Sequence, residues 1–296
     1  MFFTIIYDKV VIMDVSIVLV NYNTKDLTLK CLESIYEKTS GIEFDVFVID
    51  NASADGSSQA IKENFSQVIL IENKENLGFG RANNIGIKNS KAKYVLFLNT
   101  DTILINNAVK VLFDLLESDT KIAACGGNLF AEDGSYVHSF GYLNSPKRQL
   151  LRIFGLRYLL KDSKNNVERK SLQEVEQVIG ADLMIRKSVL DEVGLFSEKF
   201  FLYFEESELQ FRIRKAGYKI FYSPEAKLIH TEGGSTKKDK KLRRQMIAQS
   251  EYLYLLLCYT NHPKLYLRLL CTIPQLYRFF NAPKNTYKAL KYIWQN

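Results

Sequence analysis

Short apolar segments alternate along the first hundred residues with segments whose apolar side chains recur every three or four positions. Four of the apolar segments have the valine, isoleucine and leucine content typical of strands buried in a parallel sheet, and they are residues 15–20, 44–49, 68–71 and 94–98. Three segments with helical spacing lie between them, at residues 25–38, 55–65 and 82–89. Because repeated β-α-β units are joined by right-handed crossovers, the pattern predicts a Rossmann-like α/β fold.

The second half of the chain has a weaker pattern. Residues 123–178 are interpreted as short strands and loops, and the charged stretch at residues 161–170 is interpreted as an insertion or a mobile loop. Regular elements return after Gly180. Three are expected, namely helices over residues 181–193 and 205–216 and a strand over residues 218–222 that ends at Pro224. A helical tail is expected after the glycine pair at residues 233–234.

Polar residues follow three of the four predicted strands at the position where each strand ends. They are Asn-Tyr-Asn at residues 21–23, Asp-Asn-Ala-Ser at residues 50–53 and Asn-Thr-Asp at residues 99–101. Each group alone is ordinary turn chemistry, because Asn and Asp readily begin turns and helices. In an open parallel sheet, however, ligands bind beyond the carboxyl ends of the strands. Three such groups together predict a ligand site at this edge.

The net charge of +7 is concentrated in the tail. Residues 237–296 contain twelve Lys or Arg against Asp239 and Glu251, which gives +10 and leaves −3 for the rest of the chain. Two interpretations remain open for this basic, aromatic segment: it lies on an anionic membrane surface, or it packs on the main domain as a helical appendage. Its apolar runs fall short of the roughly 20 residues that cross a bilayer. No recognisable nucleic-acid module accompanies the charge, so nucleic acid is not an expected partner.

Cysteine usage and the amino-terminal residues bear on location. The four cysteines are scattered and contain no Cys-x-x-Cys pair, which favours free thiols in a reducing, cytoplasmic compartment. Residues 1–12 lack the pattern of a signal peptide, and either Met1 or Met13 is the true start. The expected organisation is an extension at 1–12, a main domain at 13–236 and a tail at 237–296. Membrane binding by the tail would make the protein peripheral at the inner face of the plasma membrane.

Seven short motifs follow one another in a fixed order. They are VNYN at 20–23, DNASADGS at 50–57, NLGFGRANNIG at 76–86, NTD at 99–101, GAD at 180–182, FEESEL at 204–209 and HTEGGS at 230–235. This series resembles the inverting family 2 glycosyltransferases with a GT-A fold, particularly the bacterial branch that contains rhamnosyltransferases. The resemblance covers residues 15–235. It implies a GT-A Rossmann-like mixed, mainly parallel sheet flanked by helices, with a carboxyl-terminal helical appendage.

The resemblance also implies where the nucleotide binds. The nucleotide-binding residues that it indicates are Asn21, Asp50, Arg81, Asn84 and Asn99. Asp50 would accept the ring N–H of uracil or thymine. Arg81 lies on a glycine-containing turn from which a guanidinium can pair with phosphate or cover the base. Many relatives have an arginine where this chain has Asn83, and Arg81 is expected to take its place.

A divalent metal is the expected cofactor. The Asn99–Asp101 segment occupies the position of the family's Asp-x-Asp motif, whose last carboxylate holds Mg²⁺ or Mn²⁺ against the diphosphate. Such cations favour oxygen ligands and keep water and phosphate in their shell, so Asp101 with the diphosphate can suffice. His230 resembles a family position that can join this shell, although a lone histidine after a strand is more often structural. The glycine pair at 233–234 could let its segment close over the diphosphate.

The catalytic base is expected at Glu206. An inverting transfer needs a carboxylate to deprotonate the acceptor hydroxyl as it attacks the anomeric carbon. The family usually has Glu-Asp at this position, whereas this chain has Glu205-Glu206, so Glu206 reaches one methylene further. In the alternative interpretation, Glu205, Glu206 and Glu208 only complement the positive end of a helix. Such a charge at an exposed helix terminus stabilises the fold by about 0.3–1 kcal/mol. Asp182 and Glu205 are placed on the acceptor or sugar side, and a helix start explains Asp182 equally well.

The sequence therefore predicts an inverting glycosyltransferase that moves a sugar from a nucleoside-diphosphate sugar, either dTDP-rhamnose or a UDP-sugar, in bacterial surface polysaccharide synthesis. The acceptor is expected to be a glycan or a polyprenyl-linked molecule. A non-catalytic sugar-nucleotide-binding scaffold is the alternative, favoured by Asn99 and Glu206 where relatives carry Asp. A nucleotidyltransferase, which would release pyrophosphate from a nucleoside triphosphate, is a third hypothesis.

Overall fold

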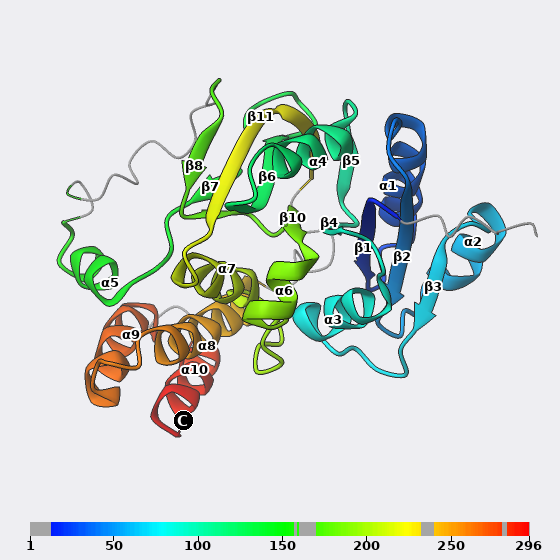
Figure 1. Cartoon of the computed structure of the whole chain (residues 1–296). Helices are drawn as coiled ribbons and strands as arrows, with labels where there is room; N and C mark the ends of the chain where they lie inside the picture. Colours follow the sequence, from blue (N-terminus) through cyan, green and yellow to red (C-terminus); the bar gives the residue numbers. More distant parts are fainter. Residues whose placement is uncertain (1–12, 157–158, 160–169, 232–239, 280–282, 296) are drawn as a thin grey trace, which may run out of the picture.

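The first four strands form the parallel half of the central sheet, as the apolar pattern predicts (Figure 1). In the computed structural model, which describes residues 13–156, 159, 170–231, 240–279 and 283–295, these strands are β1 (Val15–Asn21), β2 (Phe44–Asp50), β3 (Ile69–Glu72) and β4 (Tyr94–Asn99). The helices between them are α1 (Lys25–Lys38), α2 (Ser57–Asn64) and α3 (Phe79–Asn89). Strand β1 pairs in parallel with both β2 and β4, so the polar carboxyl ends of all three strands meet at one edge.

The second half of the chain extends this sheet with mixed pairing. Its strands are β5 (Thr102–Leu104), β6 (Ile122–Phe130), β8 (Gln173–Val175), β10 (Asp182–Arg186) and β11 (Lys219–His230). The sheet order is β3-β2-β1-β4-β10-β6-β11-β5, with β8 on β11, and the short strands β7 (Phe140–Gly141) and β9 (Gln177–Val178) pair separately. The helices are α4 (Ala108–Ser118), α5 (Pro146–Ile153), α6 (Lys187–Val193) and α7 (Glu205–Lys215). The predicted mixed, mainly parallel α/β fold is confirmed.

Two predicted elements of this half are wrong in part. Residues 182–186 form strand β10, where a helix was expected, because four of its five side chains are buried in the middle of the sheet between β4 and β6. A strand buried on both faces has a continuous apolar run, which periodicity cannot distinguish from a buried helix. Strand β11 continues past Pro224 to His230. Its register on β6 shifts between Tyr222 and Lys227, so the proline lies where the ladder is interrupted and no hydrogen bond is lost.

Strand β6 is a nine-residue central strand that covers the start of the region expected to hold only short strands and loops. Its sequence hides this because Gly126 and Gly127 replace the usual branched side chains. A Cβ at Gly127 would lie 2.5 Å from the carbonyl oxygen of Ala226, and one at Gly126 would lie 3.0 Å from the Cβ of Val178. The two glycines therefore leave room for the Ala226 backbone at Gly127 and for the Val178 side chain at Gly126. Most of the charged stretch at 161–170 lies outside the described residues, as does the extension at 1–12.

Helices cover both faces of the sheet and create two apolar cores. On β1 the side chains alternate between the cores, with Val15, Ile17 and Leu19 on one face and Val18 on the other. Helices α1 and α4 supply the first core, and α3, α6 and α7 supply the second. This two-sided burial explains why the strands have continuous apolar runs.

The basic tail forms three helices, α8 (Lys240–Cys258), α9 (Lys264–Phe279) and α10 (Pro283–Gln295), that gather beside α7 (Figure 1). A third apolar cluster joins Phe200 of the main domain to buried residues of all three helices, including Tyr254, Leu267 and Ile293. The tail therefore packs on the main domain, as one of the two interpretations predicted. None of the described helices combines the length and apolar character needed to cross a bilayer. All four cysteines are free thiols, as expected.

Candidate functional site

Asn21 and Asp50, two of the residues predicted to bind the nucleotide, lie next to each other at the ends of β1 and β2. Asn21 and Asp50 are paired in the β1–β2 register, and the Asn21 Nδ2 donates to Asp50 Oδ1 at 2.6 Å. The second carboxylate oxygen, Oδ2, accepts the backbone N–H of Ser53 at 2.9 Å. Both residues are buried. The Asn21 Oδ1 accepts the hydroxyls of Thr24 and Thr28 at 2.8 Å each, so Asn21 is saturated within the protein and orients Asp50.

Asn51 connects this pair to the loop that precedes α3. In the sequence, Asn51 was noted only as part of a motif. Its Nδ2 donates to Asn76 Oδ1 and to the carbonyl oxygen of Gly78, both at 3.2 Å, and its Oδ1 accepts Asn73 Nδ2 at 2.8 Å. Gly78 has φ +82°, and a Cβ there would lie 2.2 Å from the carbonyl oxygen of Phe201. Glycine is therefore required where the start of α3 meets the segment that precedes α7.

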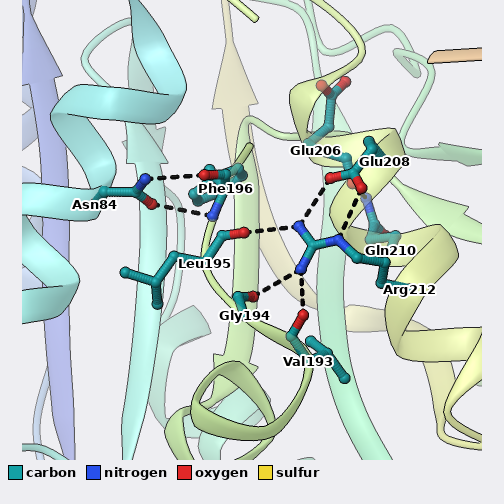
Figure 2. A network of polar contacts seen from close by, with 9 residues as sticks. All are labelled: Asn84, Val193, Gly194, Leu195, Phe196, Glu206, Glu208, Gln210 and Arg212. Atoms are coloured by element: carbon teal, nitrogen blue, oxygen red, sulfur yellow. Dashed lines mark hydrogen bonds and ion pairs between the residues drawn. The ribbon is translucent and has the colours of Figure 1, made fainter. Parts of the chain in front are cut away.

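Arg81 and Asn84, predicted to bind nucleotide, both point at the connection between α6 and α7. Asn84 is buried and pairs with the backbone of Phe196, donating to its carbonyl at 2.9 Å and accepting its N–H at 3.0 Å (Figure 2). Arg81 Nε donates to the carbonyl oxygen of Glu198 at 3.2 Å, and half of the Arg81 side chain is exposed. Asn84 thus holds the backbone of this connection. A nucleotide contact by either residue stays a prediction.

The predicted metal residues meet at the next strand ends. Asp101 Oδ1 lies 3.3 Å from His230 Nε2, and the two side chains are each 10% exposed. The β11–β5 pairing creates this contact, because His230 is opposite Thr102 and the Thr231 N–H donates to the carbonyl of Asp101 at 3.1 Å. Asn99 is partly buried at the end of β4. The glycine pair at 233–234 lies outside the described residues.

Asp182 lies at the start of β10, close to the same strand ends. Its buried Oδ2 accepts the Gly127 N–H at 2.5 Å, while Oδ1 has no hydrogen-bond partner within the described part of the chain. Burial raises the pKa of Asp182 to about 7, and the Gly127 N–H and the nearby His230 partly offset this rise. This first residue of a strand is not a helix start, which removes the alternative explanation weighed from the sequence. Its acceptor-side role stays a prediction.

The candidate base lies in a strained segment. Tyr203 and Phe204 have φ of +71° and +67°, a left-handed conformation that costs non-glycine residues about 1–3 kcal/mol each. Immediately afterwards, α7 begins with Glu205 and Glu206. The backbone strain is consistent with a segment held in place by its surroundings rather than by local preference.

The three acids of the first turn have different environments, so they do not act as one set of dipole-stabilising charges. Glu208 forms a two-pronged ion pair with Arg212, at 2.8 Å on each side. Glu205 is buried, and its Oε2 has no hydrogen-bond partner among the described residues. Burial and the neighbouring Glu206 raise the pKa of Glu205 well above its usual range. Glu206 is half-buried, and Figure 2 shows its side chain pointing away from Arg212.

Glu206 lies beside the residues that precede Asp182. Burial raises the pKa of its carboxyl group. A Cβ built on Gly180 would lie 3.2 Å from Glu206 Cγ. The next residue, Ala181, accepts the Asn99 N–H at 2.9 Å, so Glu206 and the Asn99–Asp101 turn flank the same short segment. The structure therefore brings the predicted base to the strand ends that carry the predicted metal residue.

The contact at Gly180 is testable. We expect Gly180→Ala to lower kcat by about tenfold and to change Tm little. The added methyl group would displace Glu206, and small displacements of a reacting group lower the rate strongly. Gly141→Ala is the matched control, since its Cβ would lie 3.2 Å from His138 Nε2, a side chain outside the site. Steady-state kinetics and thermal unfolding of both variants measure the difference. An equal loss of activity in both would contradict the assigned position of Glu206.

Two residues of α7, Arg212 and Gln210, escaped the sequence interpretation. Arg212 donates to the carbonyl oxygens of Val193, Gly194 and Leu195 at 2.6, 2.9 and 2.7 Å, in addition to its pair with Glu208 (Figure 2). Gln210 holds both backbone groups of Val178, accepting the N–H at 2.8 Å and donating to the carbonyl at 3.0 Å. The i,i+4 spacing of Glu208 and Arg212 was the only available signal.

Comparison with known proteins shows the fold and the family of this chain. Among solved structures, the fold is similar to the mannosyltransferase PcManGT of Pyrobaculum calidifontis, determined with GDP-Man and Mn²⁺ (TM-score 0.60, 16% identity, 96% of this chain and 74% of that chain). It is also similar to Staphylococcus aureus TarS 1–349 (TM-score 0.56, 14% identity, 91% and 72% covered). These likenesses show the fold alone. They show that the chain has the GT-A fold.

The chain belongs to glycosyl transferase family 2, whose sequence profile matches residues 16–194. It is 26% identical over 226 residues to the N-acetylglucosaminyl-diphospho-decaprenol L-rhamnosyltransferase of Mycobacterium tuberculosis, covering 71% of this chain and 74% of the relative. It is 26% identical over 223 residues to the low-salt glycan biosynthesis hexosyltransferase Agl10 of Haloferax volcanii, covering 74% and 67%. The protein is thus a glycosyltransferase. The profile ends before α7, so the roles of Glu206 and His230 stay predictions.

Proposed function

We propose that this protein catalyses inverting transfer of a sugar from a nucleoside-diphosphate sugar to a glycan or polyprenyl-linked acceptor in bacterial surface polysaccharide synthesis. The observation that carries the proposal is the position of Glu206, which lies beside the segment bonded to Asn99 and has a raised pKa. The names of the relatives favour rhamnose or a hexose as the sugar, and a polyprenyl diphosphate carrier as part of the acceptor.

In the proposed reaction, the Glu206 carboxylate accepts the proton of the acceptor hydroxyl while the hydroxyl oxygen attacks the anomeric carbon. The bond from that carbon to the diphosphate oxygen breaks on the opposite face, which inverts the configuration. Because burial raises the pKa of Glu206, its ionised form is a stronger base than an exposed glutamate. The raised pKa of Glu205 favours its protonated form and so reduces repulsion between the neighbouring acids.

The nucleotide would lie along the β1 and β2 ends, where Asp50 is held by Asn21 and Ser53. An ionised carboxylate has about four acceptor positions, so Asp50 can accept a base N–H in addition to these two bonds. Arg81, with half its side chain exposed, can approach the nucleotide from α3.

Asp101 and His230 fit a divalent cation only in combination with substrate. No group of three or more His, Cys, Asp and Glu in the described residues could hold a metal by itself. A single carboxylate with a neighbouring imidazole 3.3 Å away is compatible with Mg²⁺ or Mn²⁺ that takes its remaining ligands from the diphosphate and water. When bound there, the cation would offset the negative charge of the leaving diphosphate. The Mn²⁺ in the PcManGT structure supports this assignment.

The proposal is tested by thermal unfolding with UDP-, dTDP- and GDP-sugars, each with and without Mn²⁺. The correct donor at about 100 times its Kd should add about 2.7 kcal/mol to the free energy of unfolding. We expect Asp101→Ala to abolish the Mn²⁺-dependent part of this gain, and Asp114→Ala, an exposed acid on α4, to retain it. Donor binding that is equally strong in Asp101→Ala would contradict the metal assignment. Donor binding without transfer or donor hydrolysis would instead support the scaffold hypothesis.

A further inference from the structure

Helix α9 has apolar side chains on two opposite faces. Leu267, Leu270 and Cys271 are buried against the rest of the protein. On the other face, Leu265, Leu269 and Leu276 are 57%, 45% and 53% exposed. Successive residues of an α-helix are about 100° apart, so these three leucines lie within about 40° of one another and form one stripe. A helix that only packs on its domain would have polar residues there.

Helix α10 extends this surface with aromatic and basic side chains. Tyr287 and Trp294 are 61% and 45% exposed and, seven residues apart, lie on one side of the helix. The Trp294 indole N–H donates to Thr272 Oγ1 at 3.1 Å, and the Arg268 guanidinium lies 5.9 Å from the Trp294 ring centroid. Thr272 is one turn from both Leu269 and Leu276, so the indole borders the leucine stripe.

A row of lysines lies beyond the aromatic residues. Lys284, Lys288 and Lys291 are exposed and lie within about 60° of one another on α10, next to Tyr287. The order across the surface is therefore leucine, then tryptophan and tyrosine, then lysine. The same order occurs along the normal of a membrane interface, where aliphatic groups enter the acyl region, Trp and Tyr lie at headgroup depth and basic groups meet lipid phosphates.

We propose that this α9–α10 surface, formed by Leu265, Leu269, Leu276, Tyr287 and Trp294 with the three lysines, binds an anionic lipid bilayer. The charge of the segment indicates lipid as the occupant. Residues 252–296 contain six Lys or Arg and no Asp or Glu. Such a surface attracts anionic headgroups. Two copies of the surface would bring like charges together, which argues against a second copy of this chain as the occupant.

The surface is connected to the catalytic segment through α8. Ser250 Oγ donates to the carbonyl oxygen of Leu202 at 2.8 Å, and the Arg243 guanidinium lies 5.9 Å from the ring centroid of Tyr203. Leu202 and Tyr203 immediately precede the first turn of α7. Membrane binding by α9 and α10 would therefore hold the Glu206 segment close to a lipid-linked acceptor. This consequence rests on the proposed function, whereas membrane binding does not depend on it.

Sedimentation of the purified full chain with vesicles tests the proposal. We expect it to bind vesicles of phosphatidylcholine with phosphatidylglycerol at low salt, and to bind pure phosphatidylcholine or the anionic vesicles at high salt much less. Leu265→Ser/Leu269→Ser should lower the partition coefficient by about tenfold or more, because two exposed apolar side chains no longer enter the acyl region. Lys288→Glu/Lys291→Glu should lower it by a similar factor and reduce its dependence on salt.

Matched controls use residues of similar exposure elsewhere. Ile69 and Ile105 are 42% and 43% exposed, so Ile69→Ser/Ile105→Ser controls for loss of surface apolar area, and Lys30→Glu controls for charge. Both controls should bind as the wild type does. Circular dichroism verifies folding, and transfer to a soluble acceptor should be unchanged in every variant, which separates this proposal from the proposed function. Three results would each overturn the proposal of membrane binding. The wild type could stay in the supernatant, the leucine variants could bind vesicles normally, or the leucine variants could lose only self-association.

Discussion

Replacing Glu206 by glutamine is expected to lower kcat for sugar transfer by about 10²- to 10⁴-fold, the usual contribution of a general base. Glutamine keeps the shape of the side chain but cannot accept the proton of the acceptor hydroxyl. Because Glu206 is assigned no nucleotide contact, donor affinity measured by thermal shift should be unchanged. Glu206→Asp, which restores the residue usual in the family, should keep a substantial part of the activity. Glu63→Gln, an exposed acid on α2, should have no effect.

The same assignment predicts the pH dependence of the reaction. Burial raises the pKa of Glu206, so the base stays protonated to a higher pH than an ordinary glutamate. Activity should therefore rise with pH through the raised pKa and be lost as pH falls through it. The residual activity of Glu206→Gln should lack this limb of the profile. A glutamine variant that transfers sugar at the wild-type rate, or one that keeps the same acidic limb, would exclude Glu206 as the base.

Replacing Arg212 by methionine is expected to lower the free energy of unfolding by about 3–5 kcal/mol, because it leaves a buried carboxylate without its partner. The Glu208 side chain is only 8% exposed and is bonded to Arg212 through both oxygens. The substitution also removes the donors to the carbonyls of residues 193–195, which lead to the Phe196 backbone held by Asn84. Activity should fall as well, since α7 carries Glu206.

Urea denaturation with a constant m-value measures the loss in Arg212→Met. Arg214→Met on the same helix is the matched control. Its side chain is 32% exposed and lies 3.6 Å from Glu174, so an ion-pair loss of about 0–1 kcal/mol is expected. The double variant Glu208→Gln/Arg212→Met should recover part of the stability, because no charge is left buried and unpaired. A loss in Arg212→Met no larger than in Arg214→Met would show that the contacts of Arg212 do not support α7.

The parallel half of the fold, and the sheet edge at which the candidate site lies, could be predicted from local sequence. Strands β1, β2 and β4 end in polar residues, and parallel pairing necessarily brings such ends to one edge. Asn21 and Asp50 therefore become neighbours, as do the Asn99 turn and Ala181 once the sheet forms. The family resemblance singled out Glu206 as the base, and this role stays a prediction.

Other residues had roles that local sequence could not predict. Asn21 and Asn84 were predicted to bind the nucleotide, a role that stays a prediction, and the structure adds hydrogen bonds from Asn21 to Asp50 and between Asn84 and the Phe196 backbone. The sequence left open that the three acids that open α7 only complement the helix terminus, but Arg212 pairs with Glu208, Glu205 is buried, and Glu206 lies near the strand ends. Hydrogen-bond partners 29 or more residues apart leave no periodic signal.

The sequence by itself determined the β-α-β order, the polar edge and the charge of the tail, because these depend on alternation and composition within short segments. Only the tertiary structure decided that residues 182–186 are a strand, that β11 passes Pro224, and that α8 to α10 pack beside α7 while α9 keeps a leucine stripe exposed. Burial on a second face is set by partners distant in the chain. Local periodicity indicates which residues are apolar, but it does not indicate which part of the protein covers them.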